Sequence, residues 1–159
     1  MSAADTEALR QETTALLQSE LDALRQRIAD NMLAAGEWAS GRTAQGMAVE
    51  IKDAGDFVRA FLYARPYFGA LETGSRPWAR PPKRVPKAFA QTIAAWIEAK
   101  GLTLNEWAVA YTIIHEGTAL YRSGGRSDIY SNEIPVTLDR LGERMALAYV
   151  QHITLHSNL

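Results

Sequence analysis

Two halves of the chain meet at residues 63–78, which read Tyr-Ala-Arg-Pro-Tyr-Phe-Gly-Ala-Leu-Glu-Thr-Gly-Ser-Arg-Pro-Trp. Each proline keeps the residue before it extended, so Arg65 and Arg76 are expected outside helices. Gly69 and Gly74 allow a positive φ or the close approach of another backbone. Aromatic side chains beside these breaks bury large areas. The stretch predicts a rigid "aromatic corner", which suits either the core of an ordinary domain or a contact with a partner.

The composition is that of one folded domain. The chain has 159 residues, of which 47% are hydrophobic and 22% charged, enough for a hydrophobic core. A net charge of −1 gives no overall attraction to nucleic acid or to a membrane. The absence of cysteine excludes disulfides and thiolate chemistry. No apolar run is long enough for a bilayer, and no signal peptide is recognised, so we expect synthesis in the cytoplasm and no membrane partner.

The N-terminal segment, residues 1–36, predicts a long helix that ends near Gly36. Its apolar residues step by three or four along one narrow stripe: Leu17, Leu21, Leu24, Ile28 and Met32. A helix with one such stripe must lie on the rest of its own domain or on a neighbouring subunit. The sequence leaves both arrangements open.

Residues 40–78 predict a β-hairpin followed by the aromatic corner. Met47, Val49 and Ile51 alternate with polar or small residues, as in a strand with one solvent-exposed face. A turn containing Gly55 separates this strand from a second, more apolar one over residues 57–63.

Residues 86–157 predict three helices. The first is expected to bury Phe89, Ile93, Trp96 and Ile97 and to end at Lys100-Gly101. The second is expected to start at a capping box of Thr103 and Glu106 and to bury a stripe of Leu104, Trp107, Tyr111 and Ile114. The third carries Leu138, Leu141, Met145, Ala148 and Tyr149. The predicted fold class is α+β in a single domain, 1–159: a long helix, a small antiparallel sheet as the hairpin core, then three helices.

The segment between the corner and these helices is basic and rich in proline. It holds Arg76, Arg80, Lys83, Arg84 and Lys87, together with Pro77, Pro81, Pro82 and Pro86, and no acid. The prolines keep this basic loop, residues 76–87, extended. Its cations suit phosphate or an acidic protein surface, or they serve only to keep the loop solvated.

No motif for catalysis is found. His115-Glu116 resembles the start of a helical zinc-protease motif, but the second histidine is replaced by Ala119. Carboxylates are scattered over helix faces, so no acid–base pair is nominated. We therefore expect no enzyme activity, no catalytic residue, no cofactor and no metal ligand.

The aromatic corner over residues 67–77 resembles a family of neck proteins of tailed bacteriophages. These are the tail-completion, or head–tail joining, proteins of the minor tail protein Z type. In the most similar branch a proline-rich loop follows, here Pro81-Pro82, and then a helix ending in Trp96-Ile97 and Lys100-Gly101. Residues 117–130, which read Gly-Thr-Ala-Leu-Tyr-Arg-Ser-Gly-Gly-Arg-Ser-Asp-Ile-Tyr, are similar too. The resemblance covers roughly residues 40–132.

The resemblance implies a structural virion protein that forms a ring, a hexamer or dodecamer, between the head and the tail. Its implied partners are copies of itself, the portal, adaptor and stopper proteins of the neck, the tail tube or tail terminator protein, and DNA crossing the lumen. We expect the protein interface to use nine residues of the corner and the basic loop: Tyr67, Phe68, Glu72, Arg76, Trp78, Arg80, Lys83, Arg84 and Lys87.

Two alternatives come from other classes of protein. The first is a small nucleic-acid-binding module that uses the basic loop, residues 76–87. The second is an enzyme whose site is assembled from residues far apart in the sequence.

Overall fold

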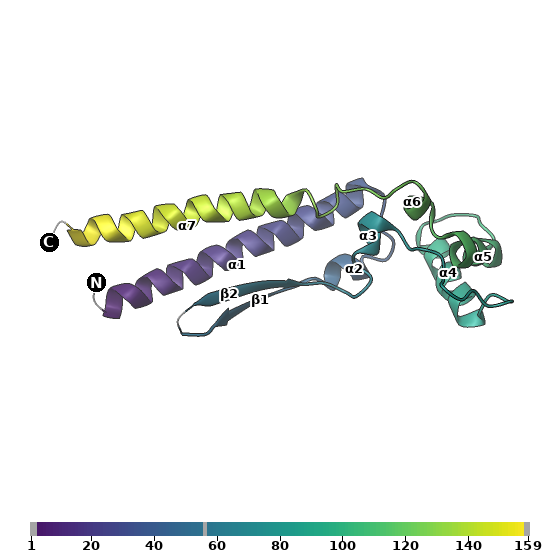
Figure 1. The fold of residues 1–159 in the computed structure, drawn as a ribbon, viewed down its shortest axis with the longest axis horizontal. Coiled ribbons are helices and arrows are strands. Elements are labelled where there is room, and N and C mark those ends of the chain that lie inside the picture. The colour runs from purple at the N-terminus through teal and green to yellow at the C-terminus, as the bar shows by residue number, and fades with distance from the viewer. Residues whose placement is uncertain (1–2, 56, 158–159) are drawn as a thin grey trace.

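The computed structural model describes residues 3–55 and 57–157. Figure 1 shows an elongated molecule in which α1 and α7 run side by side and α4 and α5 form a head at the far end. The elements in chain order are α1 (Ala3–Ala34), α2 (Arg42–Gln45), β1 (Ala48–Asp53), β2 (Val58–Tyr63), α3 (Ala70–Thr73), α4 (Lys87–Ala99), α5 (Glu106–Glu116), α6 (Ala119–Arg122) and α7 (Glu133–Ser157). The α+β class is confirmed; the short helices α2, α3 and α6 were not predicted.

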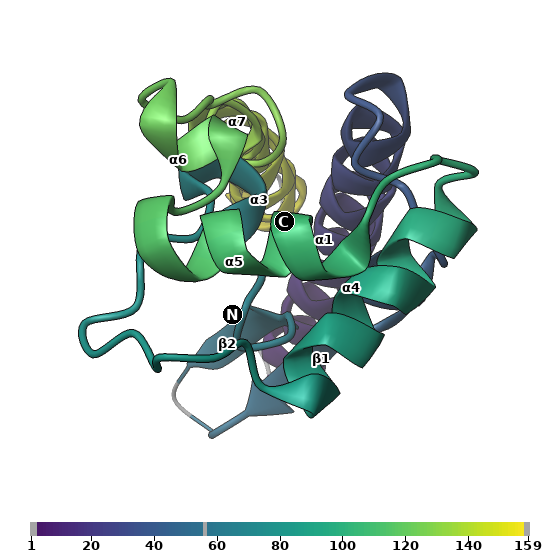
Figure 2. The same ribbon diagram turned by 90° about the vertical axis from the view of Figure 1, so that its right-hand side faces the viewer.

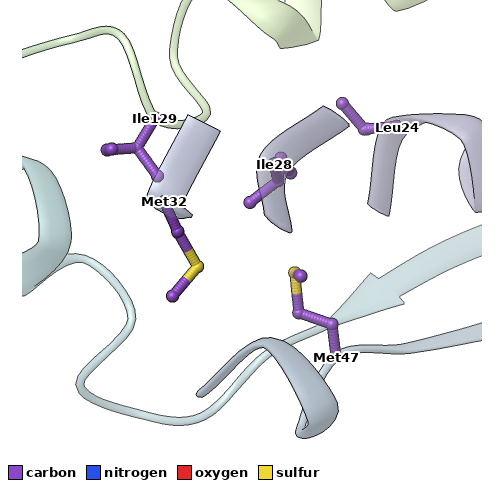
Figure 3. Packing of buried hydrophobic residues seen from close by; sticks show 5 residues of the cluster. All are labelled: Leu24, Ile28, Met32, Met47 and Ile129. Carbon is purple, nitrogen blue, oxygen red and sulfur yellow. The ribbon is translucent and has the colours of Figure 1, made fainter. Parts of the chain in front are cut away.

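The predicted stripe of α1 forms one side of the main core. Leu24, Ile28 and Met32 are 5%, 2% and 2% exposed and pack with Met47 and Ile129. Figure 3 shows these five side chains converging from the helix, the segment before β1 and the loop before α7. Long α1 therefore packs on its own chain, which decides between the two arrangements that the sequence left open.

Polar contacts join α1 to the antiparallel α7. Glu20 is only 3% exposed, and its carboxylate pairs with the guanidinium groups of Arg144 and Arg140. Nearer the head, Arg27 Nε lies 2.9 Å from a carboxylate oxygen of Glu133. Because buried charges need partners, these pairs fix how the two helices align along their length.

The two strands form the predicted hairpin, but it is not the centre of the core. Val49 pairs with Leu62, and Ile51 pairs with Ala60, in an antiparallel register. The two-stranded sheet covers one side of α1, as Figure 1 shows. Arg10 of α1 lies 3.0 Å from Asp53 at the end of β1. The core is centred on α1 because a two-stranded sheet is too small to enclose one.

The head has a second, smaller core between α4 and α5. Ile93, Ile97 and Ala110 are buried there, and Figure 2 shows α5 crossing in front of the body beside α4. Helix α4 ends at Lys100-Gly101 as predicted. The expected start of α5 is wrong by two residues, because Asn105 and not Thr103 accepts the capping hydrogen bond.

The backbone of residues 74–78 joins the head to the body. Thr118 N–H donates to the Ser75 carbonyl at 2.9 Å, and Trp78 N–H donates to the Ile114 carbonyl at 2.9 Å. Gly74 has a φ of +68°, and a β-carbon there would lie 2.4 Å from Tyr121 N and 2.5 Å from Thr118 Oγ1. This junction therefore requires glycine at position 74.

The change Gly74→Ala should destabilise the fold by about 3 kcal/mol, since it adds both a steric overlap and an unfavourable φ. Urea unfolding followed by circular dichroism measures this loss. The control is Gly101→Ala, because Gly101 also has a positive φ, +64°, but no atom within 4 Å of the new β-carbon. It should cost only about 1 kcal/mol. Equal losses in the two variants would contradict the proposed overlap.

Candidate interaction surfaces

The Glu72 carboxylate binds the loop that precedes α7. One oxygen accepts the N–H groups of Ile129, Tyr130 and Ser131 at 3.0, 2.7 and 2.9 Å. The other accepts the Ser131 hydroxyl. Glu72 lies in the one-turn helix α3 and is 3% exposed. A single buried side chain therefore fixes the start of α7 and directs Ile129, which is fully buried, into the main core.

The environment of Glu72 favours its charged form. Burial by itself raises the pKa of the carboxyl, but the hydrogen bonds from Ser131, Tyr130 and Ile129 together lower the pKa below its usual value of 4.5. Charge at Glu72 therefore stabilises the folded state above about pH 4.5, and this contribution is lost as the pH falls through the lowered pKa.

Arg126 ties the same loop to the corner. The backbone N–H of Arg126 donates to the backbone carbonyl of Glu72 at 2.8 Å. The Arg126 guanidinium donates to both carboxylate oxygens of Asp128, at 2.6 and 2.8 Å. The guanidinium hydrogen bond lowers the pKa of Asp128 to about 2. The motif that resembled the phage family over residues 117–130 thus includes the groups that complete the corner.

The interface role predicted for Glu72 is wrong for the single chain, because its carboxylate is used inside the molecule. Phe68 is also turned inward, where its ring centroid lies 5.2 Å from that of Tyr130. Tyr67 and Trp78 are 53% and 40% exposed and remain candidates for contact with a partner. The sequence showed that the corner was aromatic but could not show which rings face the core.

An open groove of about 920 Å³ lies between the body and α4. Tyr67 of the corner lines it with Trp38 and with Phe89 and Trp96 of α4, the last two of which the sequence predicted as part of a buried helix face. Trp38 and Trp96 are 37% and 41% exposed. No motif marks this groove, because its walls come from three separate segments, residues 32–43, 65–75 and 88–99.

The basic loop exposes its charged side chains, while Val85 packs against the core of the head. All five of its cations face solvent, and within residues 3–55 and 57–157 none of them makes an ion pair. The backbone forms no helix or strand between Arg76 and Pro86. The structure therefore leaves open both a partner and simple solvation.

The prediction that one apolar stripe forms the buried face of α5 is wrong for three of its four residues. Leu104, Trp107 and Tyr111 are 51%, 45% and 54% exposed, whereas Ile114 is 1% exposed. The buried face uses the small residue Ala110 together with Ile114. The α5 surface, defined by Leu104, Trp107 and Tyr111, is thus an apolar patch on the head.

Helix α7 exposes apolar residues over much of its length. Of the predicted stripe, Ala148 is buried and Leu141 and Met145 are partly buried, but Leu138 and Tyr149 are 61% and 45% exposed. Other exposed apolar side chains on this helix are Ile134, Val136, Leu147, Val150 and Ile153. Exposed apolar side chains in such number make α7 a candidate surface for contact with another molecule.

The described part of the chain contains no group of three or more metal-ligating side chains and no helix long and apolar enough to cross a membrane. Comparisons with protein families, with curated proteins and with solved structures find no match to this chain.

The change Glu72→Gln should destabilise the fold at pH 7 by about 3 kcal/mol, because an amide accepts the buried N–H groups less well than a carboxylate. Urea unfolding at pH 7 and pH 4 measures the loss in free energy of unfolding relative to wild type, and this loss should be smaller at pH 4. Glu98→Gln, on an exposed part of α4, is the control and should change stability little. A difference that grows toward acid would contradict the assigned charge state.

Proposed function

We propose that the chain is a structural subunit of a tailed-bacteriophage neck, which forms a ring joining the portal or connector complex to the tail tube. The resemblance of the corner, the basic loop and residues 117–130 suggests this class. The observation that carries the proposal is the exposure of all four tryptophans, Trp38, Trp78, Trp96 and Trp107, at 37%, 40%, 41% and 45%.

Exposed tryptophan is informative because this side chain buries a large area in most folded proteins and anchors protein interfaces. Trp38 and Trp96 line the groove, Trp107 lies on the α5 surface, and Trp78 packs on Phe89 at a centroid distance of 5.3 Å. The four side chains therefore lie on three parts of the surface, which are the groove, the α5 surface and the basic loop. A subunit that contacts neighbours on more than one side accounts for all four.

The elongated shape supports a ring. Its head and its body present different surfaces, and contacts between unlike surfaces close into rings when the rotation between neighbours allows it. The neck position, the virion localisation and the partners named above belong to this proposal.

The test is made in a phage whose genome encodes this chain. Without the chain, DNA-filled heads and separate tails should accumulate, and wild-type chain supplied in trans should restore joined particles seen by electron microscopy. Arg80→Ala/Lys83→Ala/Arg84→Ala should fold normally, because these side chains have no internal partner, yet reduce the yield of joined particles about tenfold. Normal yield with this variant would remove the role of the basic loop, and joined particles without any chain would remove the proposed function.

The second candidate is binding of nucleic acid, favoured by the five exposed and unpaired cations of the basic loop. Each phosphate contact releases counterions, so five contacts predict a slope of about −4.5 for log K against log salt concentration. Fluorescence anisotropy with a labelled duplex measures this slope. Arg80→Ala/Lys83→Ala/Arg84→Ala should reduce it by about three. A flat salt dependence of the wild-type chain would exclude this candidate.

A further inference from the structure

The side of α7 that faces away from α1 carries one acidic and apolar stripe. Thr137 and Ala148 are 3% and 4% exposed and mark the covered side. Successive residues of a helix are about 100° apart, so Asp139 lies opposite Ala148. On this outward side, five residues follow one another at spacings of three, four, four and three. We call them the α7 outer stripe: Val136, Asp139, Glu143, Leu147 and Val150.

All five side chains of the α7 outer stripe are exposed. Val136, Leu147 and Val150 are 49%, 62% and 59% exposed. Asp139 and Glu143 lie one turn apart between them, and the described residues provide no cation for either. The basic residues of this helix, Arg140 and Arg144, turn instead toward Glu20. The stripe therefore presents two unpaired acids flanked by apolar side chains.

The basic loop has the complementary character. Residues 76–100 contain six cations and one acid, a formal charge of about +5, so the remaining chain carries about −6. Prolines and the 40% exposed Trp78 give the loop apolar surface beside its charges. Its extended backbone is already ordered by proline, which lowers the entropy cost of binding. The loop thus matches both the charge and the apolar character of the α7 outer stripe.

The two surfaces do not meet within one molecule. The loop lies at the head, whereas α7 extends along the body in the opposite direction (Figure 1). DNA is a poor partner for the stripe, because Asp139 and Glu143 would repel phosphate. A second copy of the chain supplies the required cations with apolar surface beside them.

We propose that the basic loop of one copy binds the α7 outer stripe of the next copy. The contact is head to tail, so each copy uses the loop once and the stripe once. This inference rests on the proposed function and names the interface by which the ring forms. Exposed ion pairs contribute little singly, so the exposed valines and leucine of the stripe must be buried in the same contact.

The experiment exchanges the charges of the two surfaces and measures assembly of the full-length chain by sedimentation velocity. Asp139→Lys/Glu143→Lys places like charges in the interface, and so does Arg80→Glu/Arg84→Glu. Each pair should raise the protein concentration at which half of the chain is assembled by roughly a hundredfold, because like charges in an interface are strongly unfavourable. The variant with all four changes should return to within about tenfold of wild type.

Two controls separate this contact from general effects of charge. Asp30→Lys/Glu98→Lys reverses two exposed acids elsewhere and should leave assembly unchanged. Circular dichroism should show wild-type helix content for every variant, since none of the four exchanged side chains has an internal partner. Two results together support the proposal. Assembly of the wild-type chain falls steeply as salt rises, and the assembly lost in each pair of changes returns only in the fourfold variant.

The proposal is overturned if the fourfold variant assembles no better than the two separate pairs, or if either pair assembles like wild type. It is also overturned if the wild-type chain remains monomeric at all concentrations. Restoration of joined phage particles by the wild-type chain would still support the neck function in each of these cases. Loss of duplex binding in Arg80→Glu/Arg84→Glu with unchanged assembly would assign the loop to DNA instead.

Discussion

The structure depends on the hydrogen bonds that the buried Glu72 carboxylate accepts from three consecutive N–H groups and one hydroxyl. Leaving those N–H groups unpaired in the interior would be costly. The carboxylate thus joins segments nearly sixty residues apart and determines where α7 begins. From that start, α7 returns along α1, and Ile129 enters the core beside Met32. One polar side chain in the corner therefore sets the geometry of the apolar body.

Local patterns predicted the elements with regular periodicity well. The stripe of α1 is confirmed because its spacing admits one buried face, and the hairpin is confirmed because alternation and a glycine turn agree. The role of Glu72 could not be predicted in this way. A Glu beside glycine and aromatic residues looks the same whether it faces a partner or a distant backbone loop, and only the tertiary fold brings residues 129–131 to it.

The outward turn of the α5 surface has a related cause. Periodicity identifies a stripe of Leu104, Trp107 and Tyr111 but does not say which molecule covers it. Helix α4 packs closely against the small Ala110 instead, since small residues permit a short distance between helices. The large aromatics are then left outside. Hydrophobic patterning thus found an apolar face of this segment, but that face is exposed in the single chain and is not part of its own core.

The net charge of the chain hides how its charges are distributed. A net charge of −1 gives no overall attraction to a charged partner, and it is the sum of one basic segment at the head and an acidic remainder of the chain. Among the described residues, none of the five cations of the basic loop forms an ion pair with these acids, so their charge is not neutralised by contacts within the chain. The charges at each end of the molecule attract molecules of opposite charge that approach that end. The same separation that keeps the basic loop and α7 apart in one molecule leaves both surfaces free to meet another molecule, and it depends on the corner, whose backbone hydrogen bonds at Ser75 and Trp78 join the head to the body.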